Sequence, residues 1–383
     1  MSPLGVAARS GGAVRSGGAV RSGGAVRSGG AAAGGTARSG GAAAGGTARS
    51  GGAAAGFPEL PGRAAPAGRF ELLRALGELS STSPAASAAV SRALGLEAMS
   101  AADHTRVFVL DLPPFASIHL GAEGKLGGEG ADRVAGLWRA LGLTPPADPD
   151  HLAVLLGLYA ELAEASRGCR TEAARRRLEH ARTVLLAEHL ASWLPGYLIA
   201  ASSYSSVAPW AALTAAALRR ELDEVGVPEQ LPVALRDAPP GPAQASGAGD
   251  LLDALVAPLR AGFVLTHQDL EDAGATTGLG VRRGERRYAL QAMFDQDPLA
   301  TCGWLAGHAL RWSAAHRESD GPFARWWASR ARETASALAD LPHLEPPGLL
   351  PGGGLEEVAA EQIGGGGQPR ALPPDEVPAS AQR

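Results

Sequence analysis

Apolar residues recur at helical spacing through most of the chain between residues 68 and 338. Phe70, Leu73 and Leu76 fall close to one stripe of a helix, and apolar residues recur in the same way over residues 134–141. A stripe of this kind is the face that a helix buries against the core of a globular protein. The pattern therefore predicts an all-α fold for this part of the chain.

Two Asp-Pro pairs mark expected helix starts, one at Asp148 and Pro149 and the other at Asp297 and Pro298. An aspartate at the N-cap accepts a hydrogen bond from an amide of the first turn, and proline is tolerated at the first helical position. Only residues 106–112 (RVFVLDL) have the β-branched and aromatic composition of a strand. Because one strand cannot build a sheet, the predicted fold class stays all-α.

Composition divides the chain into parts that can fold and parts that cannot. Residues 1–56 repeat units such as RSGGAV and contain no aromatic and no acidic residue, so they cannot bury enough apolar surface to offset the entropy of ordering. The aromatic residues Trp304 and Trp312 share a helix face, which we expect to dock on the main helical domain. The predicted order is a disordered Gly/Ala/Arg/Ser tail (1–56), a helical domain (68–222), a linker (226–249), an additional helical block (250–338) and a disordered Pro/Gly-rich tail (341–383).

The charge balance argues against a nucleic-acid-binding protein. Residues 1–56 carry six arginines and no acidic residue, so the formal net charge of −4 leaves −10 for the rest of the chain. The uncharged run 190–218 has a serine-rich middle and the prolines Pro195 and Pro209, which favours two buried helices around a loop over a stable membrane insertion. Two cysteines make no disulfide framework and no apolar signal segment is present, so a cytoplasmic location is expected.

Motifs of catalysis and metal binding are absent from the sequence. There is no HExxH, no CxxC, no pair of histidines at i and i+4, no phosphate-binding loop and no G-x-S-x-G elbow, so neither a cofactor nor an enzymatic activity is expected. A cluster of arginines allows two interpretations, a solvated helix face or a docking patch for an acidic partner. The cluster comprises Arg282, Arg283, Arg286 and Arg287.

The segment PPFASIHLGAEGKLGG, residues 113–128, resembles the signature of the TorD/DmsD family, cytoplasmic chaperones that mature molybdenum-containing oxidoreductases. His119 stands where that family has an aromatic residue. The residues that fall on the signature are Pro113, Pro114, Phe115, Ser117, Ile118, Leu120, Leu126, Gly127 and, on the helix that follows, Trp138.

Three further pieces of the family pattern follow in the family's order, and the resemblance covers residues 68–222. In the hinge ADPDH, Ala147 and Asp148 stand where the family has Glu and Pro. The residues that match are Asp150 and His151 of the hinge, His189, Leu190 and Trp193 of a His-Leu-x-x-Trp motif, and Trp210 at the start of the final helix.

The resemblance implies a helical bundle that binds the twin-arginine signal peptide of a client in a groove between the signature segment and the hinge. The client would be the catalytic subunit of a molybdenum-containing oxidoreductase of the dimethyl-sulfoxide-reductase superfamily, held in its apo form for cofactor insertion and proofread before export. Phe115 and Trp193 would supply apolar area, and Asp150 would pair with arginines of the leader. The implied binding residues are Pro114, Phe115, Ser117, His119, Leu126, Gly128, Asp150, His151, His189 and Trp193.

Other interpretations of the same residues stay open. Asp150 is also suited to stabilise a helix N-terminus, and Phe115, Trp193 and His151 are suited to the core. A helical metal-dependent hydrolase could use Asp150, His151 and His189 as ligands, and stoichiometric metal in the purified protein would favour it. A permanent assembly subunit would instead co-purify with the finished, cofactor-loaded oxidoreductase.

Overall fold

A computed structural model of the chain describes residues 68–341, which are helical and contain no strand. The prediction of an all-α fold is therefore confirmed for this part of the chain. The predicted disordered tails, 1–56 and 341–383, lie outside the described residues, except for Leu341, which caps the last helix.

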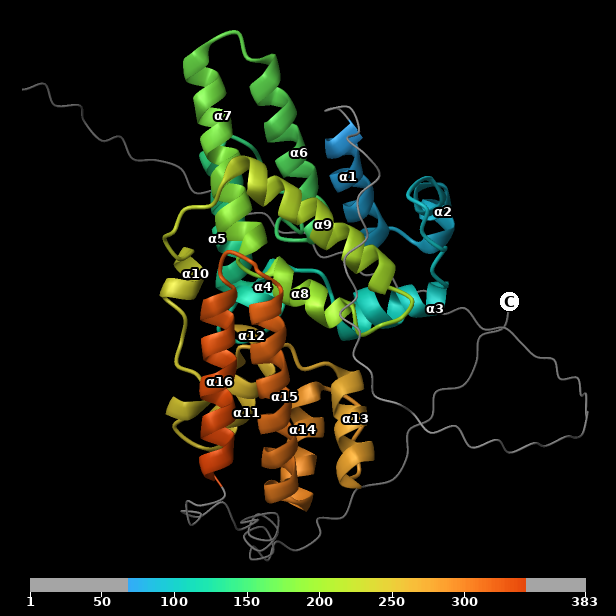
Figure 1. Ribbon diagram of the computed structural model, residues 1–383, viewed down its shortest axis with the longest axis vertical. Coiled ribbons are helices and arrows are strands. Elements are labelled where there is room, and N and C mark those ends of the chain that lie inside the picture. Colours follow the sequence, from blue (N-terminus) through green and yellow to red (C-terminus); the bar gives the residue numbers. More distant parts are fainter. Residues whose placement is uncertain (1–67, 342–383) are drawn as a thin grey trace, which may run out of the picture. The chain divides into compact units, whose positions relative to one another are not determined.

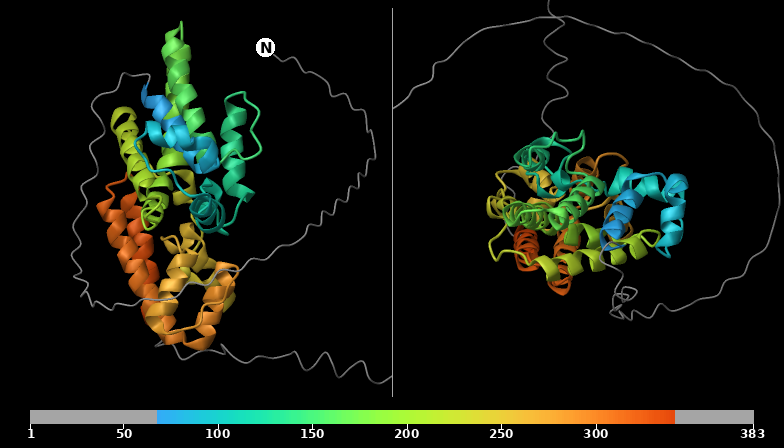
Figure 2. Two further views of the ribbon diagram at one scale, coloured as in Figure 1. Left: turned by 90° about the vertical axis from the view of Figure 1, so that its right-hand side faces the viewer. Right: turned by 90° about the horizontal axis from the view of Figure 1, so that it is seen from above.

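The first block of helices runs from α1 to α9. Within it α1 packs along α6, α7 returns along α6, and α9 packs on α1 (Figures 1 and 2). Its elements are α1 (Gly68–Ser81), α2 (Pro84–Ala93), α3 (Ala101–His104), η1 (Thr105–Asp111), α4 (Ala116–Leu120), α5 (Gly128–Ala140), α6 (Leu152–Gly168), α7 (Glu172–Val184), η2 (Leu185–Ala191), α8 (Leu194–Ala201) and α9 (Ala208–Val225).

Buried side chains of α1 hold the first block together. Phe70 and Leu76 are completely buried, as the helical periodicity predicted. The indole N–H of Trp210 donates to the carbonyl of Leu76 at 3.0 Å and ties α9 to α1. Arg69 and Glu221 form an ion pair between the same two helices, with a distance of 2.7 Å between Nε and Oε1. The stripe seen in the sequence is thus the contact face of α1.

The prediction of a strand over residues 106–112 is wrong, because the segment forms the π-helical turn η1. Val107 and Phe108 are buried, whereas the next two residues, Val109 and Leu110, are 57% and 67% exposed. Neighbours that share one side are typical of a helix, since successive residues of a strand alternate between two faces. Composition did not distinguish the two, because β propensity depends on the surface against which a segment packs.

One of the two predicted helix starts is confirmed and the other is wrong. Asp297 caps α15 by accepting a hydrogen bond from the backbone N–H of Ala300, at 2.9 Å. The helix α6 starts later than the predicted cap Asp148; its N-cap is His151, whose Nδ1 accepts from the N–H of Ala153 at 3.1 Å. The chain turns between Asp148 and His151, where the N–H of His151 donates to the carbonyl of Asp148 at 3.3 Å, so the helix begins only after His151.

The second block of helices contains a long hairpin of α15 and α16, which lies beside the shorter helices α11, α13 and α14 (Figure 1). The block follows α10 in the chain and packs against the first block within one compact unit. The elements from α10 onward are α10 (Val233–Arg236), η3 (Pro242–Gln244), α11 (Ala248–Val256), α12 (Pro258–Ala261), α13 (His267–Thr277), α14 (Arg286–Gln296), α15 (Pro298–Glu318) and α16 (Ala324–Asp340).

Residues 226–249, predicted as a linker, contain the two short helices α10 and η3. The N–H of Val233 donates to the carboxylate of Glu188 in the first block, at 2.8 Å. Pro242 is buried, and η3 packs against α16 of the second block. The segment is therefore fastened at both of its ends.

No single helix among residues 68–341 is both long and apolar enough to cross a membrane. One bent pair, Glu172–Ala191 with Leu194–Ala201, meets the two criteria together, with a bend of 42°. The uncharged run 190–218 forms α8, α9 and the loop between them, as predicted.

Candidate peptide-binding site

The signature segment and the hinge are joined by two backbone hydrogen bonds. The N–H of Ala116 donates to the carbonyl of Asp150 at 3.0 Å, and the N–H of Leu152 donates to the carbonyl of Pro114 at 2.8 Å. These bonds make a short antiparallel bridge that fixes the end of the hinge against the signature segment. Residues of two separate motifs are thereby brought to one place in the fold.

Asp150 is buried inside this junction, with 2% of its surface exposed. Its Oδ2 accepts a hydrogen bond at 2.9 Å from the backbone N–H of Ser117, in the first turn of α4. A carboxylate at that position satisfies an amide that the helix itself leaves without a partner. Of the two interpretations that the sequence left open, the hydrogen bond to Ser117 corresponds to Asp150 as a helix-start residue.

Ser117 is completely buried and fixes the glycine-rich loop that follows α4. Its Oγ accepts a hydrogen bond from the N–H of Gly127 at 3.1 Å. A Cβ added to Gly130 would lie 2.7 Å from the Cα of Ser117, so a glycine is required for α5 to approach this closely. Leu126 is 61% exposed and Gly128 is also exposed, which places both residues at the surface beside the fixed loop.

Phe115 and His151 form the surface of the junction. They face each other across the antiparallel bridge, and their rings meet edge to face with centroids 4.7 Å apart. Both side chains are half-buried. Burial lowers the pKa of His151 below its ordinary value, against the smaller raising effects of the Asp148 and Asp150 charges. The neutral ring accepts at Nδ1, so its Nε2 carries the proton.

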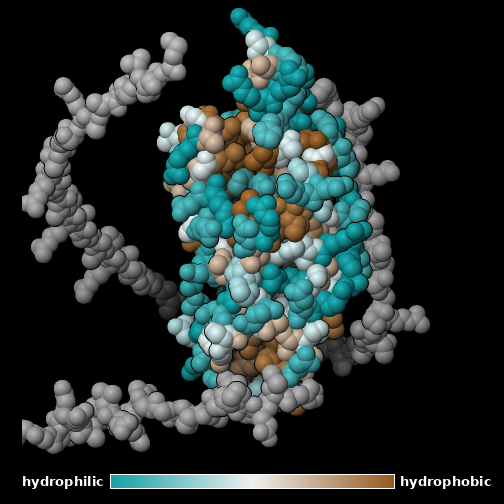
Figure 3. Space-filling view, turned by 90° about the vertical axis from the view of Figure 1, so that its left-hand side faces the viewer, coloured by the Kyte–Doolittle hydropathy of each residue, from teal (hydrophilic) through white to brown (hydrophobic). Residues whose placement is uncertain are grey.

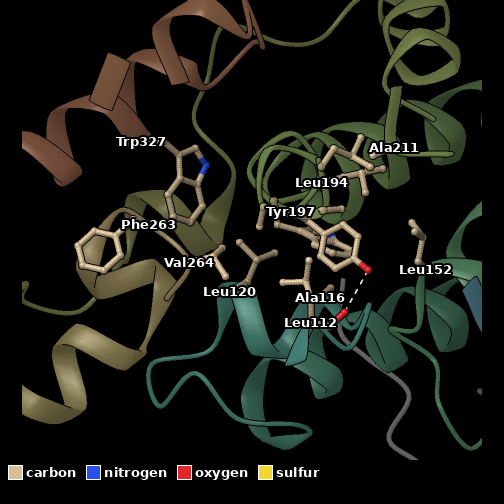
Figure 4. Close-up of a cluster of buried hydrophobic side chains, with 14 of the residues drawn as sticks. Leu112, Ala116, Leu120, Leu152, Leu194, Tyr197, Ala211, Phe263, Val264 and Trp327 are labelled. Carbon is tan, nitrogen blue, oxygen red and sulfur yellow. Dashed lines mark hydrogen bonds between the residues drawn. The ribbon is translucent and has the colours of Figure 1, made fainter. Parts of the chain in front are cut away.

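His119 and Trp193, in contrast, lie in the interior. The His119 ring stacks on Trp193 with centroids 5.0 Å apart and meets Tyr197 edge to face at 5.4 Å. Burial lowers the pKa of His119 to about 3, so this histidine is neutral near pH 7 and fills the place of the family's aromatic residue. The Tyr197 hydroxyl donates to the carbonyl of Leu112 at 3.1 Å and ties α8 to the start of the signature segment (Figure 4).

His189 joins the interior group through its backbone. Its carbonyl accepts a hydrogen bond from the indole N–H of Trp193 at 2.7 Å. Burial, with a smaller effect of the Arg133 charge, lowers the pKa of the His189 side chain to about 4. The ten predicted site residues thus form two groups. The surface part lies around Phe115, at the junction of the signature segment and the hinge, and the interior part lies around Trp193.

The three ligands of the metal-hydrolase alternative do not form a metal site in the described part of the chain. Among residues 68–341, no group of three or more His, Cys, Asp or Glu side chains is placed to hold a metal ion. The carboxylate of Asp150 is engaged by Ser117, and Nδ1 of His151 by Ala153. The alternative therefore has no assembled ligand set on these residues.

The second block covers the interior part of the site. The indole N–H of Trp327 on α16 donates to the carbonyl of Ser192 at 2.9 Å, directly before Trp193. Figure 4 shows Phe263 and Trp327 of the second block on one side, and Leu120 of the signature segment on the other. A small apolar cavity remains between the two blocks, lined from both sides. Trp193 is consequently 1% exposed.

The residues of the second block that lie over Trp193 were not identified as site residues from the sequence. The one available signal was the shared helix face of Trp304 and Trp312, which indicated that the second block must bury an aromatic surface. Trp312 and His316 of α15 line the cavity. A Cβ added to Gly196 would lie 3.3 Å from Cε1 of His316, so α8 and α15 approach each other closely there.

A second contact between the blocks is polar and centres on the buried carboxylate of Asp111. Asp111 accepts hydrogen bonds from the Tyr204 hydroxyl and from the backbone N–H of His267, the latter at 2.7 Å. Ring Nδ1 of His267 lies 3.1 Å from the same carboxylate, and Nε2 lies 2.8 Å from the carbonyl of Gly284. Because both ring nitrogens face acceptors, a doubly protonated ring satisfies both. We refer to Asp111, Tyr204 and His267 as the latch.

The latch shifts the pKa of both of its charged members. The hydrogen bond with Asp111 raises the pKa of His267 above its ordinary value, against a smaller lowering by burial. Burial by itself would raise the pKa of Asp111, but hydrogen bonds from His267 and Tyr204 bring it below its ordinary value. The protonated ring and the carboxylate therefore stabilise each other near neutral pH.

The predicted arginine cluster does not form one surface patch. Arg286 donates to the carbonyl of Leu265 at 2.6 Å, and burial lowers its pKa. Arg287 pairs with Asp253 at 2.5 Å on the neighbouring helix α11. The remaining two arginines, Arg282 and Arg283, are exposed in the loop before α14. Two of the four thus serve contacts within the second block.

Comparison with known proteins gives one family match. Residues 71–198 match the family described as nitrate reductase delta subunit, which is of the TorD type and acts as a chaperone in molybdoenzyme maturation. No curated protein and no solved structure matches the chain. The matched residues contain the signature segment, the hinge and the His-Leu-x-x-Trp motif, whereas the second block lies outside them. The part of the chain that carries the bridged signature segment and hinge is thus similar to nitrate reductase delta subunits.

Proposed function

We propose that this chain is a cytoplasmic, non-catalytic chaperone that binds the apo catalytic subunit of a molybdenum-containing oxidoreductase. It recognises the twin-arginine leader of that subunit, keeps the subunit competent for cofactor insertion and delays its export. The family match over residues 71–198 supports the general role. The observation that carries the proposal is the antiparallel bridge between Phe115 and His151, because it joins the two motifs into one surface.

The physical basis for binding is an apolar surface whose backbone is already ordered. Pro113 and Pro114 restrict the segment before Phe115, and the bridge to the hinge restricts it further, so little entropy is lost when a peptide docks. Exposed apolar side chains flank Phe115 in the sequence on both sides. They are Val109 and Leu110 before it, and Leu126 after it.

On the side where α10 lies in Figure 1, apolar surface gathers in patches that polar residues separate (Figure 3). A leader has an apolar stretch and adjacent arginines, so it needs a carboxylate near the apolar contact. Asp148 is exposed in the hinge, three residues before His151, and we assign the arginine contact to it in place of the buried Asp150.

The test is a calorimetric titration of a synthetic leader peptide, with two adjacent arginines and an apolar stretch, into the full chain. Phe115→Ala should weaken binding by about 1–3 kcal/mol, the value of burying such a side chain, at low and high salt alike. Asp148→Asn should weaken binding by at most about 1 kcal/mol, as expected for an exposed ion pair, and the loss should shrink at high salt.

Two variants serve as controls for this titration. Asp150→Asn makes the same charge change at the buried hinge position and keeps an acceptor for Ser117, so it should bind the leader nearly as wild type does. Leu310→Ala removes a side chain that is 53% exposed on α15 of the second block and should have no effect. Equal affinity of Phe115→Ala and wild type would show that the leader does not use this surface.

A further inference from the structure

The interior part of the site is apolar, aromatic and covered by the chain itself. His119 and Trp193 are 2% and 1% exposed because the second block lies over them. In Figure 4, Val264 and Trp327 of the second block lie next to Leu120 of α4. An apolar surface of this kind, next to Phe115, would extend the leader-binding surface if the cover were removed.

The second block has the internal contacts needed to move as one body. A Cβ added to Gly262 would lie 2.3 Å from the backbone nitrogen of Ala331, and Gly262 has a φ of +81°, so α12 and α16 are in direct backbone contact there. The Thr334 hydroxyl donates to the carbonyl of Ala261 at 2.8 Å, and Nε2 of His316 lies 3.0 Å from the carbonyl of Gly262. These contacts join α12, α15 and α16 without any residue of the first block.

The polar contacts between the two blocks are few and lie at separate points. They include the latch, the bond from Trp327 to Ser192, and a bond at 3.2 Å between Arg106 and Gln268. Arg219 also donates to the carbonyl of Ser319 at 2.9 Å and lies 3.6 Å from the carboxylate of Asp320. The connection between the blocks, residues 226–249, contains five prolines and four glycines, so it can change direction without breaking a long helix.

A polar atom of His119 lacks a partner beneath the second block. Nε2 of His119 is buried and has no hydrogen bond among the described residues. A buried nitrogen of this kind costs free energy, and water or a peptide would satisfy it once the cover is lifted. An aromatic carbon at the same place would carry no such cost. His119 therefore destabilises the closed state relative to an open one.

We propose that the second block, residues 248–341, is a reversible cover over His119 and Trp193, held closed by the latch, and that the apolar stretch of a leader peptide replaces it. This inference rests on the proposed function, because it concerns access to the same binding surface. The latch residues Asp111 and His267 come from different blocks, so their contact is lost when the cover opens. Binding of a leader and closure of the cover exclude each other at this surface.

The test compares wild type with two variants of the full chain that shift the cover in opposite directions. His267→Gln weakens the latch, and amides of residues 189–197 should exchange hydrogen about tenfold faster, as expected from the loss of roughly one hydrogen bond to a charged group. His119→Phe removes the unpartnered nitrogen, and the same amides should exchange more slowly. Exchange in the middle of α6 should stay as in wild type, because α6 belongs to the first block.

Leader affinity should follow the exchange rates, rising in His267→Gln and falling in His119→Phe. If residue 119 only contacted the leader, His119→Phe should instead bind the leader more tightly, because phenylalanine offers more apolar surface than histidine. Equal exchange rates at residues 189–197 in all three proteins would overturn the proposal of a reversible cover. A rise in exchange rate that includes α6 would overturn it as well. Altered exchange with unaltered leader affinity would overturn the competition but leave the proposed function standing. Altered exchange without leader binding by any protein would support the cover's movement and overturn the proposed function.

Discussion

Replacing Trp193 by alanine should lower the free energy of unfolding of the full chain by about 3–5 kcal/mol, the usual cost of truncating a buried aromatic residue. The side chain is 1% exposed, and its ring contacts those of His119 and Tyr197. Its indole N–H also donates to the carbonyl of His189. Denaturant unfolding followed by far-ultraviolet circular dichroism measures the loss.

Tyr288→Ala is the matched control, because this aromatic side chain is 58% exposed on α14. It should change stability by no more than about 0.5 kcal/mol. The result also decides between the two interpretations that the sequence left open for Trp193. A variant that unfolds as wild type does, yet fails to bind a leader, would identify the ring as a client contact and not as part of the core.

Asp111→Ala should be comparably damaging, with a loss of about 2–5 kcal/mol near neutral pH. The substitution leaves two buried donors without an acceptor, the Tyr204 hydroxyl and the backbone N–H of His267, and each such donor costs about 1–3 kcal/mol. Asp253→Ala is a suitable control, because that carboxylate pairs with Arg287 at a site that is 54% exposed. Its loss should stay below about 1 kcal/mol.

The latch also predicts how stability depends on pH. Because the folded state raises the pKa of His267, this group stabilises the fold fully below its unfolded pKa of about 6.5, and the contribution is lost as pH rises through the higher folded value. Asp111 has a lowered pKa, so its contribution is present above its unfolded pKa of about 3.9 and is lost as pH falls through the lower folded value. The latch is therefore strongest between these two unfolded values.

Arg106, Asp269 and Arg286 are the other charged groups around the latch. Unfolding measured from pH 6 to pH 9 should show the stability advantage of wild type over His267→Gln shrinking as pH rises. Buried histidines with a lowered pKa, such as His119, His151 and His189, make the fold more stable with rising pH in both proteins alike, so the difference between the two profiles reports on His267. Parallel profiles for the two proteins would mean that His267 is not held protonated by Asp111.

Local sequence patterns were sufficient where neighbouring residues decide the structure. The α1 stripe and the Asp297 cap were predicted correctly, because helical spacing and an N-cap are properties of a few consecutive positions. The start of α6 was predicted wrongly, since the chain turns after Asp148 and the N–H of Leu152 donates to the carbonyl of Pro114, a tertiary contact. The turn η1 was mistaken for a strand, because its burial pattern depends on what it packs against.

The candidate site was also predicted only in part, because its residues are far apart in the sequence. The meeting of Phe115 with His151 was expected only from the family resemblance, because no periodicity connects residues so far apart in the sequence. The burial of Asp150 and Trp193 was left undecided, since both are covered by segments that are distant along the chain. The aromatic stripe of α15 indicated that the second block must dock, but not which surface it would cover.

In the function that we propose, the chain holds a molybdoenzyme subunit before its cofactor is inserted. A test is to isolate the full chain by an affinity tag from cells that co-express a molybdenum-containing catalytic subunit with its twin-arginine leader, and to measure molybdenum per bound subunit by mass spectrometry. We expect a bound subunit that contains almost no molybdenum, and release of that subunit once cofactor insertion is allowed. A stable complex with one equivalent of molybdenum per subunit would rule out this function and would identify the chain as a permanent assembly subunit.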